Sequence, residues 1–174
     1  MLQRPNENEY PEYYVPYVSL VRDGDLITLL KENLAQVSEL FDSLSDEDGQ
    51  YRYAHGKWSI KEVLGHISDT ERVMSYRLLR IGRGDQTSLA GFNEEYFVNG
   101  SQVNDLPIKS ILNEYITVRN ATIALIENMP KSAWENVGNA NNLPVTARAV
   151  AYILAGHEIH HRNIITQKYL PNIK

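Results

Sequence analysis

The sequence predicts an all-α fold, a four-helix bundle with long crossover connections. Four segments of about twenty residues carry apolar side chains at intervals of three and four, which places those side chains along one side of a helix. Two long linkers separate the last three of these segments. A bundle buries such apolar stripes against one another. Nowhere does the alternation of apolar and polar residues indicate a convincing pair of β strands.

Composition limits the classes of function. A chain of 174 residues can bury a core as one domain, residues 1–174, without covalent cross-links. It has no cysteine, which excludes disulfides, thiolate metal sites and a cysteine nucleophile. A net charge of −5 without a Lys/Arg cluster argues against a nucleic-acid partner. Neither a signal peptide nor a run of about eighteen apolar residues occurs, so we expect a cytoplasmic protein without a membrane partner.

The N-terminal segment, residues 1–20, differs in character from the rest of the chain. It holds three prolines and four tyrosines, so we expect an extended arm that packs its rings on the domain or on a partner subunit and forms no helix. The first helix follows, with an apolar stripe from Leu26 to Leu44. A polar connection, residues 45–57, leads to the second helix.

The second helix has a clear start and two polar residues of interest. Ser59 followed by Glu62 is a capping box, and the apolar stripe runs to Ile81. His66 lies on the flank of this stripe, and Glu71 points inward with it. A buried acid needs a partner, so Glu71 would either hydrogen-bond a metal-ligating histidine or form half of a buried ion pair.

Two linkers frame the third helix. The segment Gly82–Leu106 is longer than compact domains usually contain without a purpose, and we expect it to cover a site. Pro107 suits the first turn of a helix whose stripe ends near Met129. A second linker, residues 131–143, leads to the last helix, which is entered through Thr146.

The last helix carries three of the five histidines. His157 and His161 are four residues apart on the apolar stripe, a spacing at which two imidazoles can bind one metal ion. His66 could supply a third ligand from a facing helix and leave one position open, which is typical of a catalytic zinc site. Each histidine could instead be a hydrogen-bonded core residue, and the spacing alone leaves both interpretations open. His160 should face a neighbouring groove, and His55 the surface.

The same residues match HExxH, the signature of zinc metalloproteases. Those enzymes take their third ligand from further along the chain, but residues 162–174 contain no His, Asp, Glu or Cys. A protease of this type is therefore disfavoured. Glu158 is turned about 100° away from His157 around the helix, and we assign it no role.

Two segments resemble the signatures of the DinB-like superfamily, which includes the YfiT-type enzymes: Trp58–Glu71 (WSIKEVLGHISDTE) and Gly156–Ile164 (GHEIHHRNI). The resemblance implies a four-helix bundle of the DinB/YfiT type and a homodimer. It also implies one divalent metal ion, zinc or nickel, bound by His66, His157 and His161.

The resemblance further implies thiol-dependent chemistry, in which a low-molecular-weight thiol is transferred to an electrophilic small molecule. This is physically coherent, because a cation held by three neutral ligands keeps its full charge and can deprotonate a bound thiol. The alternatives are a metal-dependent hydrolase and a non-catalytic stress protein that binds a metal or a small molecule.

Overall fold

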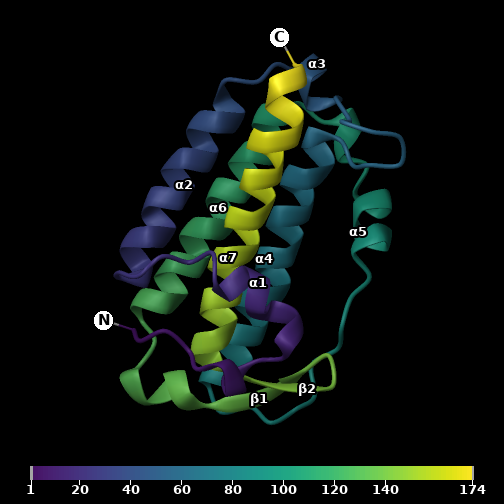
Figure 1. Ribbon diagram of the computed structural model, residues 1–174. Coiled ribbons are helices and arrows are strands. Elements are labelled where there is room, and N and C mark those ends of the chain that lie inside the picture. Colours follow the sequence, from purple (N-terminus) through teal and green to yellow (C-terminus); the bar gives the residue numbers. More distant parts are fainter. Residues whose placement is uncertain (1, 174) are drawn as a thin grey trace.

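The computed structural model describes residues 2–173, within which four long helices form a bundle (Figure 1). These are α2 (Leu26–Asp42), α4 (Ile60–Gly82), α6 (Ile108–Glu127) and α7 (Ala147–Ile164). A single-turn helix, α3 (Asp46–Gly49), precedes α4, and α7 continues as a π-helical turn over Ile165–Tyr169. Helix α4 packs on α6 and α7, and α2 packs on α6. The prediction of a four-helix bundle is confirmed.

Local signals in the sequence fix where the long helices begin. The Ser59 hydroxyl accepts the Glu62 N–H at 3.1 Å, and the Ser59 N–H donates to the Glu62 carboxylate at 2.7 Å, which completes the predicted capping box. Asp25 and Thr146 cap α2 and α7 through their side chains. Pro107 is the residue before the first turn of α6 rather than a member of that turn.

The segment between α4 and α6 runs along the bundle, because the two helices point in the same direction (Figure 1). It contains α5 (Glu94–Ser101), which Asn93 caps by accepting the Tyr96 N–H at 3.0 Å, and a 3-10 turn over Val103–Asp105. Helix α5 packs against α4. The segment predicted as a long loop therefore holds an ordered helix.

The prediction that the chain has no strand pair is wrong. Strands β1 (Val137–Ala140) and β2 (Leu143–Thr146) pair antiparallel just before α7. Asn141 and Asn142 join them with φ angles of 54° and 63°. Asparagine adopts this left-handed conformation more readily than most residues, and two such residues in succession make a tight hairpin turn. The Asn-rich run interpreted as a linker was the signal for this turn.

The N-terminal arm is not extended throughout, as was predicted, but contains short helical turns. These are 3-10 turns over Glu7–Glu9 and Glu12–Tyr14 and the single-turn helix α1 (Val15–Val18). Pro16 is tolerated because it stands in the first turn of α1, where a proline costs no helical hydrogen bond. Helix α1 packs on α7 of the same chain.

Glu9 anchors the arm at the start of α7. Its carboxylate accepts hydrogen bonds from Thr146 Oγ1 at 2.9 Å and from Arg148 Nε at 2.6 Å. Burial raises the pKa of Glu9, but the hydrogen bonds from Arg148, Asn6 and Thr146 outweigh it and lower the pKa to about 2. The carboxylate is therefore ionised at neutral pH.

A layer of buried polar side chains crosses the middle of the bundle and separates two apolar clusters. On α4, Ile67 belongs to one cluster and Met74 to the other; along α7 and the π-helical turn that follows it, the change falls between Ala155 and Ile165. Polar groups at this depth need partners, so the layer is where chemistry is expected. Its buried members are Asn33, His66, Thr70, Glu71, Arg119, Thr122, His157 and Glu158.

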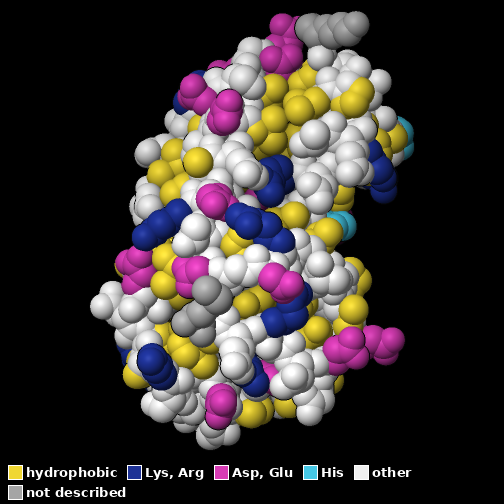
Figure 2. All heavy atoms as spheres, turned by 60° about the vertical axis from the view of Figure 1, so that its left-hand side comes forward, with side chains coloured by type: hydrophobic (Ala, Val, Ile, Leu, Met, Phe, Trp, Pro, Cys, Tyr) yellow, Lys and Arg dark blue, Asp and Glu magenta, His cyan; other side chains and the backbone are white. Residues whose placement is uncertain are grey.

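The surface is mixed in charge. On the face drawn in Figure 2, Lys and Arg side chains are interspersed with Asp and Glu side chains, in line with 17 basic and 22 acidic residues in the chain. Within residues 2–173, none of the helices combines the length and the apolar character needed to cross a membrane.

Candidate metal centre

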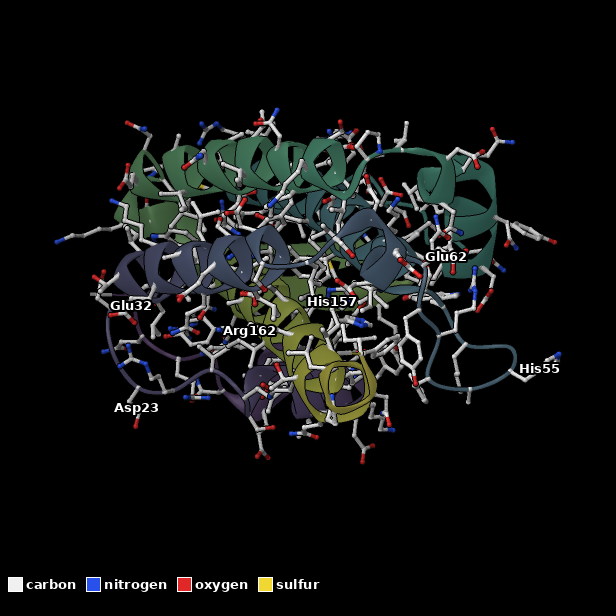
Figure 3. All side chains as sticks on the ribbon, turned by 90° about the horizontal axis from the view of Figure 1, so that it is seen from above. Asp23, Glu32, His55, Glu62, His157 and Arg162 are labelled. Carbon is white, nitrogen blue, oxygen red and sulfur yellow. The ribbon has the colours of Figure 1, made fainter. Side chains whose placement is uncertain are left out.

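Three histidines meet in the polar layer where α4 lies against α7. His66, His157 and His161 each offer one ring nitrogen, and these three atoms lie within 4.8 Å of one another. The Nε2 atoms of His66 and His157 face each other at 3.0 Å. Figure 3 shows His157 inside the bundle, whereas His55 lies at the tip of an exposed loop. The structure thus brings together the three histidines expected from the sequence.

Burial keeps these imidazoles neutral. It lowers the pKa of His66 to about 4, with a smaller contribution from His160. Burial, followed by the neighbouring imidazoles, holds the pKa of His157 and of His161 well below 6.5. The neutral imidazole is the form that binds a metal ion.

The spacing of the nitrogens suits a metal ion. Zinc–nitrogen bonds of 2.0–2.1 Å at tetrahedral angles place ligand nitrogens about 3.3 Å apart. The separation of 3.0 Å between His66 and His157, and the limit of 4.8 Å for the whole set, bracket that value. The ring nitrogens of His66, His157 and His161 are therefore spaced suitably to bind one divalent cation.

His66 is held in place from two sides. The Trp58 ring packs on the His66 ring with centroids 4.7 Å apart, and the Thr70 hydroxyl lies 3.5 Å from His66 Nδ1. The indole N–H of Trp58 donates in turn to the Glu95 carboxylate of α5 at 3.4 Å. Helix α5 is thus connected to the histidine cluster through Trp58.

The arm covers the cluster beside His157. The Tyr17 ring packs on His157 and His160, with centroid separations of 5.6 and 5.3 Å. A Cβ atom on Gly156 would meet the Tyr17 carbonyl oxygen at 2.0 Å, so only glycine permits this close approach. His160 borders a surface hollow with Tyr13 and Tyr17, which agrees with the expectation that it faces a groove.

A hollow of about 200 Å³ adjoins His161. Its walls are mainly aromatic and aliphatic, and Lys57 and Glu95 add one charge of each sign; the other lining residues are Tyr53, Gly56, Trp58, Val63, Ile164 and Tyr169. Tyr96, an aromatic residue of the segment that was expected to cover a site, is 76% exposed and does not line this hollow. Glu95 is therefore the residue through which α5 borders this hollow.

The inward acid Glu71 forms a buried ion pair. Arg119 donates to the Glu71 carboxylate from Nε at 2.7 Å and from Nη2 at 2.8 Å. Of the two alternatives for Glu71, the structure selects the ion pair. The sequence analysis missed Arg119, although Arg119 follows Tyr115 by four residues on the inner stripe of α6.

Glu158 belongs to the same network. Its carboxylate lies 3.6 Å from Arg119 Nη1 and 3.3 Å from Arg162 Nε, within ion-pair distance but without a hydrogen bond. Burial raises the pKa of Glu158. Glu158 is thus paired with the arginines, and the role that glutamate plays in an HExxH protease has no counterpart in this arrangement.

Comparison with known proteins places the chain in a family. Residues 29–165 match the model of the DinB superfamily. The chain belongs to this superfamily. A relative from Oceanobacillus iheyensis, "Putative metal-dependent hydrolase OB0413", is 25% identical over 128 residues, which make up 72% of this chain and 73% of that protein. The resemblance noted in the sequence is therefore confirmed.

Solved structures of other proteins share the fold. YfiT from Bacillus subtilis, "a probable metal-dependent hydrolase with an unusual four-helix bundle topology", superposes with a TM-score of 0.74 at 14% identity over 95% of this chain and 90% of YfiT. The mycothiol-dependent maleylpyruvate isomerase superposes with a TM-score of 0.66 at 11% identity, over 83% of this chain and 61% of the isomerase. At identities this low, the superpositions show a shared fold and nothing about function.

Proposed function

We propose that His66, His157 and His161 bind one divalent metal ion, zinc or nickel, and that this DinB-type protein is a metal-dependent enzyme acting on a small molecule. The observation that carries the proposal is the convergence of three neutral imidazoles, with ring nitrogens within 4.8 Å of one another, in the polar layer. Two of them come from α7 and one from α4, so the folded bundle itself sets the spacing of the ligands.

Three protein ligands leave room for a further one. A divalent cation at such a site lowers the pKa of a bound water or thiol and so supplies a nucleophile at neutral pH. The chain's own residues would position the reactants: the hollow beside His161 takes the substrate, and Trp58 and Tyr17 exclude water from the imidazoles.

The reaction we propose is transfer of a low-molecular-weight thiol to an electrophilic small molecule. The chain has no cysteine that would compete with an external thiol for the cation. One protein of the same fold is a mycothiol-dependent isomerase, which supports the thiol. Another is described as a probable metal-dependent hydrolase, and hydrolysis by a bound hydroxide is the second candidate.

Metal analysis of single variants tests the site. Elemental analysis of the purified protein should give about one metal ion per chain. Alanine at His66, His157 or His161 should lower metal affinity by at least the 10–100-fold known for groups that only orient a ligand. His160→Ala is the matched control, because this neighbour packs on Tyr17 outside the cluster. Loss of metal from the His160 variant, with retention in the His161 variant, would overturn the assignment.

Activity assays separate the two reactions. The protein is incubated with 1-chloro-2,4-dinitrobenzene and each of glutathione, cysteine and coenzyme A, and separately with 4-nitrophenyl acetate, with and without a chelator. Thiol transfer predicts conjugation that the chelator abolishes and that added zinc or nickel restores. Chelator-sensitive ester hydrolysis without conjugation would favour the hydrolase. A metal-loaded protein inactive in both assays would favour a non-catalytic binding protein.

We also propose that the protein is a homodimer. The arm packs on α7 of its own chain, yet Tyr13 remains 66% exposed on it. An exposed aromatic ring on an ordered arm suits a subunit interface. Light scattering at micromolar concentration should give twice the chain mass of 19.9 kDa. A monomer under these conditions would contradict the proposal.

A further inference from the structure

Arg77 is a buried cation without a counter-charge. It lies on α4 nearly three turns beyond His66, and only 3% of its surface is exposed. Its Nη2 donates to the Ala90 carbonyl oxygen at 2.8 Å, and its Nη1 lies 3.6 Å from the Met74 sulfur. Within residues 2–173, Nε has no hydrogen-bond partner and Arg77 forms no ion pair with a carboxylate. The neighbouring hydroxyl is that of Tyr14, whose pKa burial raises and Arg77 partly lowers. Arg119, by comparison, is fully paired with Glu71 on its Nε side.

A buried guanidinium without a paired negative charge indicates a site for an anionic ligand. Burying a charge is unfavourable unless the charge is paired and hydrogen-bonded. The Nε–H and the neighbouring Nη2 of an arginine form the side-on edge that receives a carboxylate through two parallel hydrogen bonds. In Arg77 the buried Nε–H has no partner, and Nη2 already donates to the Ala90 carbonyl oxygen.

Arg77 lines a hollow of about 260 Å³. Three segments that are distant in the sequence enclose it: the arm at Tyr13 and Tyr14, the segment Gly91–Glu94, and the hairpin turn from Ala140 to Leu143. These segments meet at the end of the bundle where β1 and β2 lie (Figure 1). The walls combine aromatic and aliphatic side chains with the polar side chains of Arg77, Glu94 and Asn141.

Backbone contacts hold this hollow open. The Leu89 N–H donates to the Asn139 carbonyl oxygen at 2.9 Å, and the Asn141 N–H donates to that of Leu89 at 2.8 Å, so the segment before α5 is fastened to the hairpin. A Cβ atom on Gly91 would meet Asn141 Oδ1 at 2.3 Å. The hollow is therefore pre-formed, as small-molecule sites usually are.

We propose that this hollow binds a small carboxylate whose apolar or aromatic body packs on Tyr14 and Phe92 while its acid group accepts from Arg77. The charges of the lining residues favour a ligand with a single negative charge, because Arg77 is the one cation among them and the Glu94 carboxylate repels further negative charge. A phosphate dianion would suit this balance less well. The volume is slightly below the ~300–1,000 Å³ of pockets for drug-sized ligands, so one ring with a short acid substituent is the expected size.

The site is separate from the histidine cluster, because none of the three histidines lines the hollow. Tyr13 of the arm borders both this hollow and the hollow beside His160. Occupation of the Arg77 site therefore requires no metal ion, and its test is independent of the proposed function.

Benzoate and benzamide are the matched probes, since they share a shape and differ in charge. Calorimetric titration of the wild-type protein, as purified and after chelation, should show benzoate binding at least about tenfold more tightly than benzamide, the difference expected for a hydrogen-bonded charge. Chelation should leave the benzoate affinity unchanged. Equal affinity for the two probes, or no binding of benzoate at millimolar concentration, would overturn the proposal.

Two variants locate the binding on Arg77. Arg77→Gln should weaken benzoate binding at least about tenfold and leave benzamide binding unchanged. Glu94→Gln removes the opposing charge and should strengthen benzoate binding, and this variant keeps the test valid if Arg77→Gln does not fold. Circular dichroism of each variant checks that the bundle is intact. Unchanged benzoate affinity in folded Arg77→Gln would refute the assignment to this residue.

Discussion

Replacing Arg119 by methionine should unfold the bundle at a much lower temperature. The substitution keeps most of the side-chain volume but removes the guanidinium, which is 0% exposed and donates two hydrogen bonds to Glu71. Glu71 is left buried without a partner, and Glu158 keeps only Arg162, at 3.3 Å. Breaking one side of a buried ion pair costs about 3–5 kcal/mol, because the remaining charge is uncompensated.

This free energy converts into a measurable shift. For 174 residues the entropy of unfolding is about 0.37 kcal/mol/K, so each kcal/mol lowers the melting temperature by about 2.7 °C. Arg119→Met should therefore melt about 8–14 °C below the wild type. The measurement is thermal unfolding followed by far-UV circular dichroism at pH 7 in the same buffer for all variants.

A matched surface pair provides the control. Arg72, adjacent to Glu71 in sequence, pairs with Glu114 at 2.6 Å, and both side chains are more than 40% exposed. Surface pairs contribute about 0–1 kcal/mol, so Arg72→Met should melt within about 3 °C of the wild type. The double variant Arg119→Met/Glu71→Gln should recover part of the loss, because one uncompensated charge is removed. A melting temperature of Arg119→Met close to that of Arg72→Met would refute the reasoning.

Three further predictions concern the arm and the histidines. Gly156→Ala places a Cβ atom 2.0 Å from the Tyr17 carbonyl oxygen, so the arm should be displaced at a cost of roughly 1–3 kcal/mol and a protease should cut it faster. The control is Gly100→Ala, whose Cβ atom meets no other atom within 4 Å, and it should change neither the stability nor the rate of cleavage. The pKa of Glu9 is lowered to about 2 from 4.5, so its contribution to stability is present above pH 4.5 and lost as the pH falls towards 2. Glu9→Gln should therefore be less stable than the wild type at pH 7, by about 1 kcal/mol after allowance for solvent screening, and the difference in urea midpoint should vanish near pH 2. Burial lowers the pKa of His66 to about 4 from 6.5, so the metal-free protein should lose stability as the pH falls from 6.5 to 4. His66→Leu should reduce that loss, as measured by urea titrations at several pH values. An unchanged pH dependence of stability in this variant would contradict the prediction.

The helices were predictable because their signals are local. A capping box at Ser59 and an apolar stripe over the following roughly six turns specify α4 without reference to the rest of the chain. The hairpin was missed because each of its strands has only four residues, and their order depends on pairing. The left-handed conformation of Asn141 and Asn142 is permitted by their chemistry but is imposed by that pairing.

The candidate site was predictable only in part. The four-residue spacing of His157 and His161 indicates one face of a helix, and the place of His66 on the flank of another stripe made it the candidate third ligand. The resemblance to the DinB-like superfamily then favoured a metal site over three separate core histidines. The partner of Glu71 could not be deduced, because a buried acid on a helix does not reveal which of 17 basic residues faces it from another helix. Arg77 could not be singled out in the sequence for the same reason, since only the fold shows that no carboxylate among residues 2–173 pairs with it.

The docking of the arm on α7 has a consequence for the order of folding during synthesis. The arm has its partners in α7, where Glu9 meets Arg148 across 139 positions. Helix α4 also reaches α7, where His66 meets His157 across 91 positions. Contacts so distant in the sequence close large loops and form late, because the chain must first lose the entropy of those loops. A nascent chain therefore exposes its tyrosine-rich arm until α7 has emerged, and the histidine cluster cannot assemble before then.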